Sequence, residues 1–69
     1  MAESNAEFTV QGVESEEDVR EIEDELAELK GVMGTDIDAD GEAAVKFDHD
    51  ILSEERVKIT VREMGYEVE

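Results

Sequence analysis

Residues 15–31, SEEDVREIEDELAELKG, decide the fold of this chain. Apolar side chains recur there at intervals of three and four residues, which is the spacing of one buried stripe on a helix. The stripe consists of Val19, Ile22, Leu26 and Leu29. Ser15 is placed to cap the helix, and Asp18 follows three residues later as in a near capping box. Lys30 suits the negative end of the helix dipole, and Gly31 predicts a left-handed C-cap.

The segments on either side of this helix alternate as strands do. Before it, EFTVQG at 7–12 alternates Phe8 and Val10 with polar residues. After it, VMGTDIDADGEAAVKFD at 32–48 predicts a hairpin with a tight Asp-Gly turn at 40–41. The predicted apolar face of the hairpin consists of Thr35, Ile37, Ala39, Ala43, Val45 and Phe47.

The last third, SEERVKITVREMGYEVE at 53–69, carries two conflicting signals. Ser53 as an N-cap and the Met-Gly stop favour a helix. The alternation of three β-branched residues favours a strand instead. These residues are Val57, Ile59 and Val61. Both interpretations stay open on these residues alone, and a short closing strand at 66–68 fits either one.

With a second helix, the order of elements predicts an α+β, ferredoxin-like βαββαβ sandwich. Two helices would cover one face of a four-stranded antiparallel sheet, which satisfies both the one-sided strands and the single helical stripe. We expect one domain over residues 7–69, preceded by a flexible N-terminal lead over residues 1–6.

Charge is the strongest feature of the composition. The chain has 22 Asp and Glu against 6 Lys and Arg, a net charge of -16, and no cysteine. Such a surface repels nucleic acid and anionic membranes, and the absence of cysteine excludes disulfides and thiolate metal sites. No apolar run approaches the roughly 20 residues that cross a bilayer, so we expect a cytoplasmic protein without membrane insertion.

Three explanations of the acidity compete: a disordered chain, a basic partner, and a proteome adapted to molar salt. The carboxylates are spread along the whole chain and Lys is scarce, which favours the salt-adapted, halophilic interpretation. The patterned apolar residues argue against disorder.

Residues 12–48, followed by MGYEV at 64–68, resemble the heavy-metal-associated domain of copper chaperones and of metal-pumping ATPases. The matching positions are Ile22, Glu23 and Leu26, Leu29 to Val32, Phe47 and Asp48, and Gly65 and Tyr66. Most are packing and turn positions. The resemblance implies the ferredoxin-like fold, including the second helix.

The chain departs from this family where its metal ligands would be. The family carries a Gly-Met-x-Cys-x-x-Cys loop; here Gly12 and Val13 begin it, and Ser15 and Asp18 stand in place of the cysteines. Thiolates suit Cu(I), whereas a hydroxyl and a carboxylate are hard ligands. The degenerate site implied by the resemblance consists of Ser15 and Asp18 with Gly12, Val13, Glu14, Glu16 and Glu17. Either it is only a capped helix start, or it holds a hard cation weakly.

Two other groupings have weaker claims to a metal. DIDADG at 36–41 matches the first half of an EF-hand loop, but Phe47 stands where the bidentate Glu is needed. His49 lies between two aspartates and could be a ligand, although such residues are more commonly exposed and unligated. No nucleophile with a base and an orienting group is evident, so we predict no enzymatic activity.

These observations predict a cysteine-free paralogue of the metal-chaperone domain, acting without a cofactor as an interaction or regulatory module related to metal transport. In the family, docking uses the loop and the first helix. The corresponding acidic face consists of Glu16, Glu17, Arg20, Glu21 and Asp24. The implied partner is a protein with a basic face, such as a metal-transporter domain, and the chain would be a monomer or weak dimer. The alternative is a metal-binding protein with the weak hard-cation site.

Overall fold

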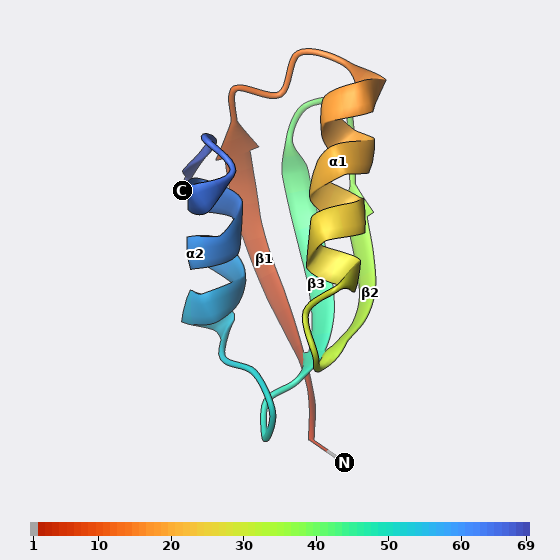
Figure 1. Ribbon diagram of the computed structural model, residues 1–69, viewed down its shortest axis with the longest axis vertical. Coiled ribbons are helices and arrows are strands. Elements are labelled where there is room, and N and C mark those ends of the chain that lie inside the picture. Colours follow the sequence, from red (N-terminus) through yellow and green to blue (C-terminus); the bar gives the residue numbers. More distant parts are fainter. Residues whose placement is uncertain (1) are drawn as a thin grey trace.

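Two helices lie on one face of a four-stranded antiparallel sheet in this computed structural model, which describes residues 2–69 (Figure 1). The elements in chain order are β1 (Glu3–Gln11), α1 (Glu16–Ala27), β2 (Val32–Ile37), β3 (Glu42–Asp48), α2 (Glu54–Glu63) and β4 (Glu67–Val68). The strand order across the sheet is β2-β3-β1-β4. The predicted βαββαβ sandwich is therefore confirmed, and no helix among residues 2–69 has the length and apolarity to cross a membrane.

Strand β1 starts earlier than the sequence suggested. Its ladder with β3 runs without a shift from Glu3, opposite Asp48, to Thr9, opposite Glu42, and Ala6 is fully buried. The prediction of a flexible lead is therefore wrong for residues 3–6, which belong to the sheet; Met1 lies outside the described residues. Polar residues extend the strand here because β3 pairs with their backbone while their side chains stay in water.

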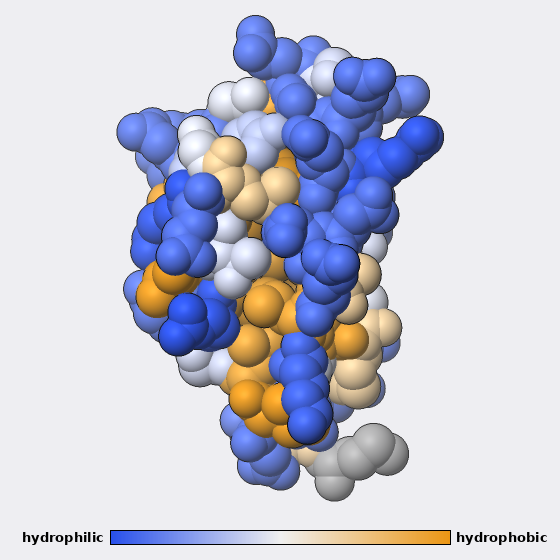
Figure 2. Space-filling view, in the orientation of Figure 1, coloured by the Kyte–Doolittle hydropathy of each residue, from blue (hydrophilic) through white to orange (hydrophobic). Residues whose placement is uncertain are grey.

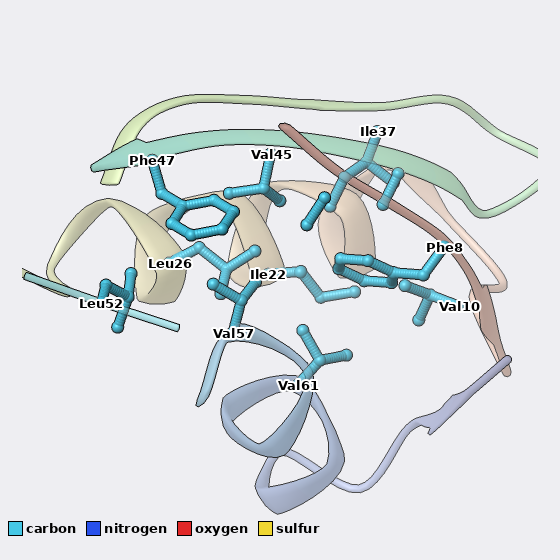
Figure 3. Close-up of a cluster of buried hydrophobic side chains, with 12 residues drawn as sticks. Phe8, Val10, Ile22, Leu26, Ile37, Val45, Phe47, Leu52, Val57 and Val61 are labelled. Atoms are coloured by element: carbon cyan, nitrogen blue, oxygen red, sulfur yellow. The ribbon is translucent and has the colours of Figure 1, made fainter. Parts of the chain in front are cut away.

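The core lies between the sheet and the helices (Figure 3). It contains Ala6, Phe8, Val10, Ile22, Leu26, Ile37, Ala43, Val45, Phe47, Leu52, Val57 and Val61. Burying each large side chain contributes about 1.5–3 kcal/mol. The last third of the chain, for which helix and strand were both predicted, forms helix α2. Ser53 caps this helix by accepting a hydrogen bond from the Arg56 N–H (3.1 Å), and two valines of α2 are buried in the core. Tertiary burial outweighs the strand preference of the β-branched residues.

Helix α1 ends four residues before the predicted cap glycine. Its C-cap is Glu28, whose N–H donates to the Glu25 carbonyl, and the Leu29 N–H donates to the Leu26 carbonyl (3.0 Å). These three-residue bonds tighten the last turn and end the helix. Gly31, with a φ of 106°, instead lies in the turn that leads into β2, so its assignment as the C-cap was wrong.

The hairpin turn is longer than the predicted two-residue turn. The Asp38 carboxylate accepts hydrogen bonds from the N–H groups of Asp40 (2.9 Å) and Glu42 (3.1 Å), and so organises a turn over residues 38–41. Ala39 therefore lies in this exposed turn and not on the apolar face of the hairpin. The Asp-rich segment forms a strand end and a turn, with no EF-hand helices around it.

Candidate functional site

The predicted site lies in the loop that connects β1 to α1, at one end of the sandwich (Figure 1). Gly12 adopts a φ of 102°, which favours glycine. Val13 is half-buried and packs against the core, whereas Glu14 and Ser15 are exposed. The loop is therefore anchored by one apolar side chain and presents polar groups to water.

Ser15 and Asp18 together cap α1. The Ser15 Oγ accepts a hydrogen bond from the Asp18 N–H (3.4 Å), and the Asp18 Oδ2 accepts one from the Glu14 N–H (2.9 Å). This is the expected near capping box, with the aspartate reaching one residue beyond the cap. The helix dipole also favours the carboxylates of Glu16, Glu17 and Asp18 in the first turn. The side chains of Ser15 and Asp18 are thus both engaged in starting the helix.

Tyr66, from the C-terminal part of the chain, packs against the loop between β1 and α1. A Cβ built on Gly12 would lie 3.6 Å from the Tyr66 Cδ1, so the ring packs beside this glycine. Burial raises the pKa of Tyr66 above 10.0, and the hydrogen bond to Asp18 raises it further, as do the charges of Asp18, Glu21 and Glu14. Sequence reasoning missed this role, because nothing local to Tyr66 signals a contact with a residue so distant in the chain.

No preformed metal centre is present among residues 2–69, where no three His, Asp or Glu side chains are grouped to hold an ion. The Asp18 carboxylate serves the cap, and Glu14, Glu16 and Glu17 are exposed, so the weak hard-cation site stays a prediction. His49 lies at the opposite end of β1. The His49 Nδ1 is 2.7 Å from the Ser4 Oγ, and the backbone N–H of His49 donates to the Ala2 carbonyl (2.8 Å).

The acidic face predicted on α1 is fully on the surface (Figure 2 shows hydrophilic residues over this helix). Its members, Glu16, Glu17, Arg20, Glu21 and Asp24, are all exposed. Beside it lies a shallow hollow between α1 and the hairpin turn, lined in part by Val19, Ile37 and Ala39. Arg20 forms no ion pair within residues 2–69. The face is thus accessible and strongly negative, and its role in docking stays a prediction.

Comparison with known sequences finds two similar mammalian proteins. The chain matches no protein-family model. It is 36% identical over 62 residues to copper-transporting ATPase 2 of Rattus norvegicus, and 39% identical over 62 residues to that of Mus musculus. Each match covers 88% of this chain and 4% of the ATPase. The chain therefore corresponds to a small part of the length of these proteins.

Solved structures of similar shape include a metallochaperone and a domain of a potential copper-translocating ATPase. The CopZ metallochaperone matches with a TM-score of 0.91 at 22% identity, covering 96% of this chain and 100% of its own. The N-terminal domain of a potential copper-translocating P-type ATPase from Bacillus subtilis matches with a TM-score of 0.89 at 24% identity, covering 100% of this chain and 86% of its own. Oxidized MerP from Ralstonia metallidurans CH34 matches with a TM-score of 0.90 at 19% identity, covering 99% and 96%. At these identities the likeness shows the fold.

Proposed function

We propose that this chain, which has the fold of the heavy-metal-associated domains, is a cysteine-free interaction module related to copper transport. It would dock a protein partner without carrying a soft metal ion, would have no resident cofactor and no catalytic activity, and would act in the cytoplasm as a monomer or weak dimer. The proposal concerns this domain and not the activity of the much longer ATPases that it partly matches.

The observation that carries the proposal is the use of the two ligand positions as a helix cap. Ser15 and Asp18 offer only oxygen atoms, and these oxygens already accept hydrogen bonds from the Asp18 and Glu14 N–H groups. Cu(I) prefers thiolate and thioether ligands. A chain with no cysteine therefore keeps the scaffold of the loop without the sulfur that would bind the ion.

The acidic face of α1 supports a partner with Lys or Arg on its docking surface. Four of its five residues are carboxylates, and all five are exposed. Charge complementarity of this kind accelerates association and selects against wrong partners. A soluble domain of a metal transporter that presents a basic face has the required chemistry.

A metal titration followed by NMR tests the first part of the proposal. Cu(I), Zn²⁺ and Ca²⁺ are added separately in high salt while the amides of residues 13–19 are observed. We expect no saturable shifts and no binding tighter than micromolar. Tight binding of Cu(I) or Zn²⁺ would overturn the proposal, and saturable shifts with Ca²⁺ alone would support the alternative hard-cation site.

Charge reversal tests the second part. A soluble copper-ATPase domain with a basic face serves as the probe, and its affinity is measured for the parent chain and for Glu17→Lys/Glu21→Lys. We expect at least tenfold weaker binding by the double variant. Glu63→Lys, exposed on α2, is the control and should bind as the parent does, apart from a small effect of net charge. Equal losses in both variants would exclude a docking role for the α1 face.

A further inference from the structure

Among residues 2–69, no strand pairs with the outer edge of β1 over residues 3–8. The short strand β4 pairs with it only at Val10, opposite Val68, and at Gln11, opposite Glu67. Thr9 and Glu69 then exchange two backbone hydrogen bonds, of 3.0 and 2.9 Å. Residues 3–8 lie beyond the end of β4, and Figure 1 shows β1 continuing well past the C-terminal segment.

The backbone hydrogen bonds of Thr9 and Val10 show which residues of β1 direct their N–H and C=O groups towards this edge. The Val10 N–H donates to Gly41 on the hairpin side, whereas Thr9 bonds Glu69 on the β4 side. Because successive residues of a strand direct their N–H and C=O groups to opposite sides, Glu7, Asn5 and Glu3 direct theirs to the same side as Thr9. These three residues are exposed.

This edge is regular, unlike the other edge of the sheet. Residues 3–9 pair with β3 without any shift, so the unpaired groups repeat at even spacing. Strand β2, at the opposite edge, has a register shift between Val32 and Gly34. Bulges of this kind twist an edge away from further pairing. The β1 edge is therefore the better template for an added strand.

We infer that residues 3–8 bind an extended cationic segment of a partner protein, which adds to β1 as an antiparallel strand in line with β4. The side chains of Glu3 and Glu7 lie on the open face of the sheet, where they are exposed. Lys or Arg at alternate positions of the added strand would lie directly opposite them. Side chains opposite Ser4, Ala6 and Phe8 would face the helix side and be small or apolar.

Charge argues for this occupant over a second copy of the chain. A copy brings the same net charge of -16 and would place carboxylates next to carboxylates. A cationic strand instead meets Glu7, which forms no ion pair within residues 2–69, and Glu3, whose contact with Lys46 spans 3.8 Å. This surface is separate from the acidic face of α1 and does not depend on the proposed function.

The peptide acetyl-Val-Lys-Val-Lys-Val-Lys-amide tests the inference, because it can place its lysines opposite Glu7, Asn5 and Glu3. NMR should show saturable binding and slowed hydrogen exchange at the amides of these three residues. The lysines also occupy the positions that exchange backbone bonds with β1, as Glu69 does with Thr9. Methylating the lysine backbone nitrogens should therefore weaken binding at least tenfold, whereas methylating the valine nitrogens should leave it nearly unchanged.

A variant of the chain provides the reciprocal test. Asn5→Pro removes an N–H that has no role in the β1–β3 ladder and blocks the added strand, with Asn5→Ala as the control. We expect circular dichroism to show that both variants fold. Only the proline variant should bind the peptide at least tenfold more weakly than the parent chain. Equal binding of the two methylated peptides, or shifts confined to α1, would overturn the inference. So would protection of the same amides by dimerisation in the absence of peptide, since a second copy would then be the occupant.

Discussion

The Oδ2 of Asp18 lies 2.9 Å from the N of Glu14, and this hydrogen bond ties the carboxylate in the first turn of α1 to the loop in front of it. The charge of the same carboxylate raises the pKa of the Tyr66 phenol, whose ring packs beside Gly12 in this loop. Asp18 thus connects the start of α1 with the residue that precedes β4.

Asp18→Ala should destabilise the domain by about 1 kcal/mol, because it removes a cap acceptor and a carboxylate from the positive end of the helix. Asp24→Ala in the same helix is the control, since Asp24 is exposed and forms no cap contact. Both variants gain the higher helix propensity of alanine. Urea unfolding should therefore separate the two midpoints, and coincident midpoints would contradict a structural role for the Asp18 contacts.

Tyr66 should titrate above its ordinary pKa of 10.0, and Asp18→Ala should bring its pKa back towards that value. As the only tyrosine in a chain without tryptophan, it gives an unambiguous phenolate absorbance. A raised pKa in the folded state means that the neutral phenol favours folding. This stabilisation is complete below about pH 10 and is lost as the pH rises through the folded pKa. An unchanged titration in the variant would show that Asp18 does not perturb the phenol.

Restoring sulfur should restore Cu(I) binding. In Ser15→Cys/Asp18→Cys both thiolates stand at the family positions on an otherwise intact loop, and Cu(I) binding should become much tighter than micromolar. Competition with a chromophoric Cu(I) chelator measures this, and Ser15→Cys alone, with one thiolate, should bind far more weakly. If the double variant folds and fails to compete, the loop geometry has diverged along with its ligands.

Gly41 and Gly34 should differ in how much stability they lose on substitution by alanine. At Gly41 the φ is 90° and an added Cβ would meet the Val10 carbonyl oxygen, so Gly41→Ala should cost at least about 2 kcal/mol. Gly34 has no atom within 4 Å of such a Cβ and no positive φ. Gly34→Ala should change the free energy of unfolding by no more than about 0.5 kcal/mol. Chemical denaturation compares them directly, and equal costs would contradict the close approach at Gly41.

The domain should lose stability in dilute salt. Several pairs of carboxylates lie four residues apart on α1, Glu17–Glu21 and Glu21–Glu25 among them. Each like-charge pair destabilises the helix by about 0.2–0.5 kcal/mol. Screening falls steeply between about 1 M and about 10 mM salt, as the Debye length grows from about 3 Å to about 30 Å. Helical circular dichroism should fall across this range, and less so in Glu21→Gln. A signal indifferent to salt would contradict the salt-adapted interpretation of the composition.

Local patterns were sufficient to predict helix α1 and the hairpin. Ile22 and Leu26 are buried because a helix places residues four apart on one face, and Ser15 and Ser53 cap because their spacing to the first-turn amides is local. The family resemblance settled the α2 region, where propensity alone was ambiguous. Burial of Val57 and Val61 against the sheet supplies the physical reason.

Features that depend on distant residues could not be predicted in this way. Glu3 and Asn5 are polar, and only their pairing with β3 makes them part of a strand. Asp18 and Tyr66 meet because the fold brings the C-terminal segment to the start of α1, and neither residue has a local signal for the other. The assignment of Ser15 and Asp18 to the family's cysteine positions rests on the sequence resemblance, and it stays a prediction.

The backbone hydrogen bonds between Thr9 and Glu69 have a practical consequence for fusing affinity tags to this domain. A tag fused after Glu69 would be directed along residues 3–8 and would compete for the edge of β1. A tag at the other terminus would emerge near His49, whose N–H bonds the Ala2 carbonyl. Immobilisation on a biosensor through that end would leave the loop between β1 and α1, at the opposite end of β1, facing the analyte.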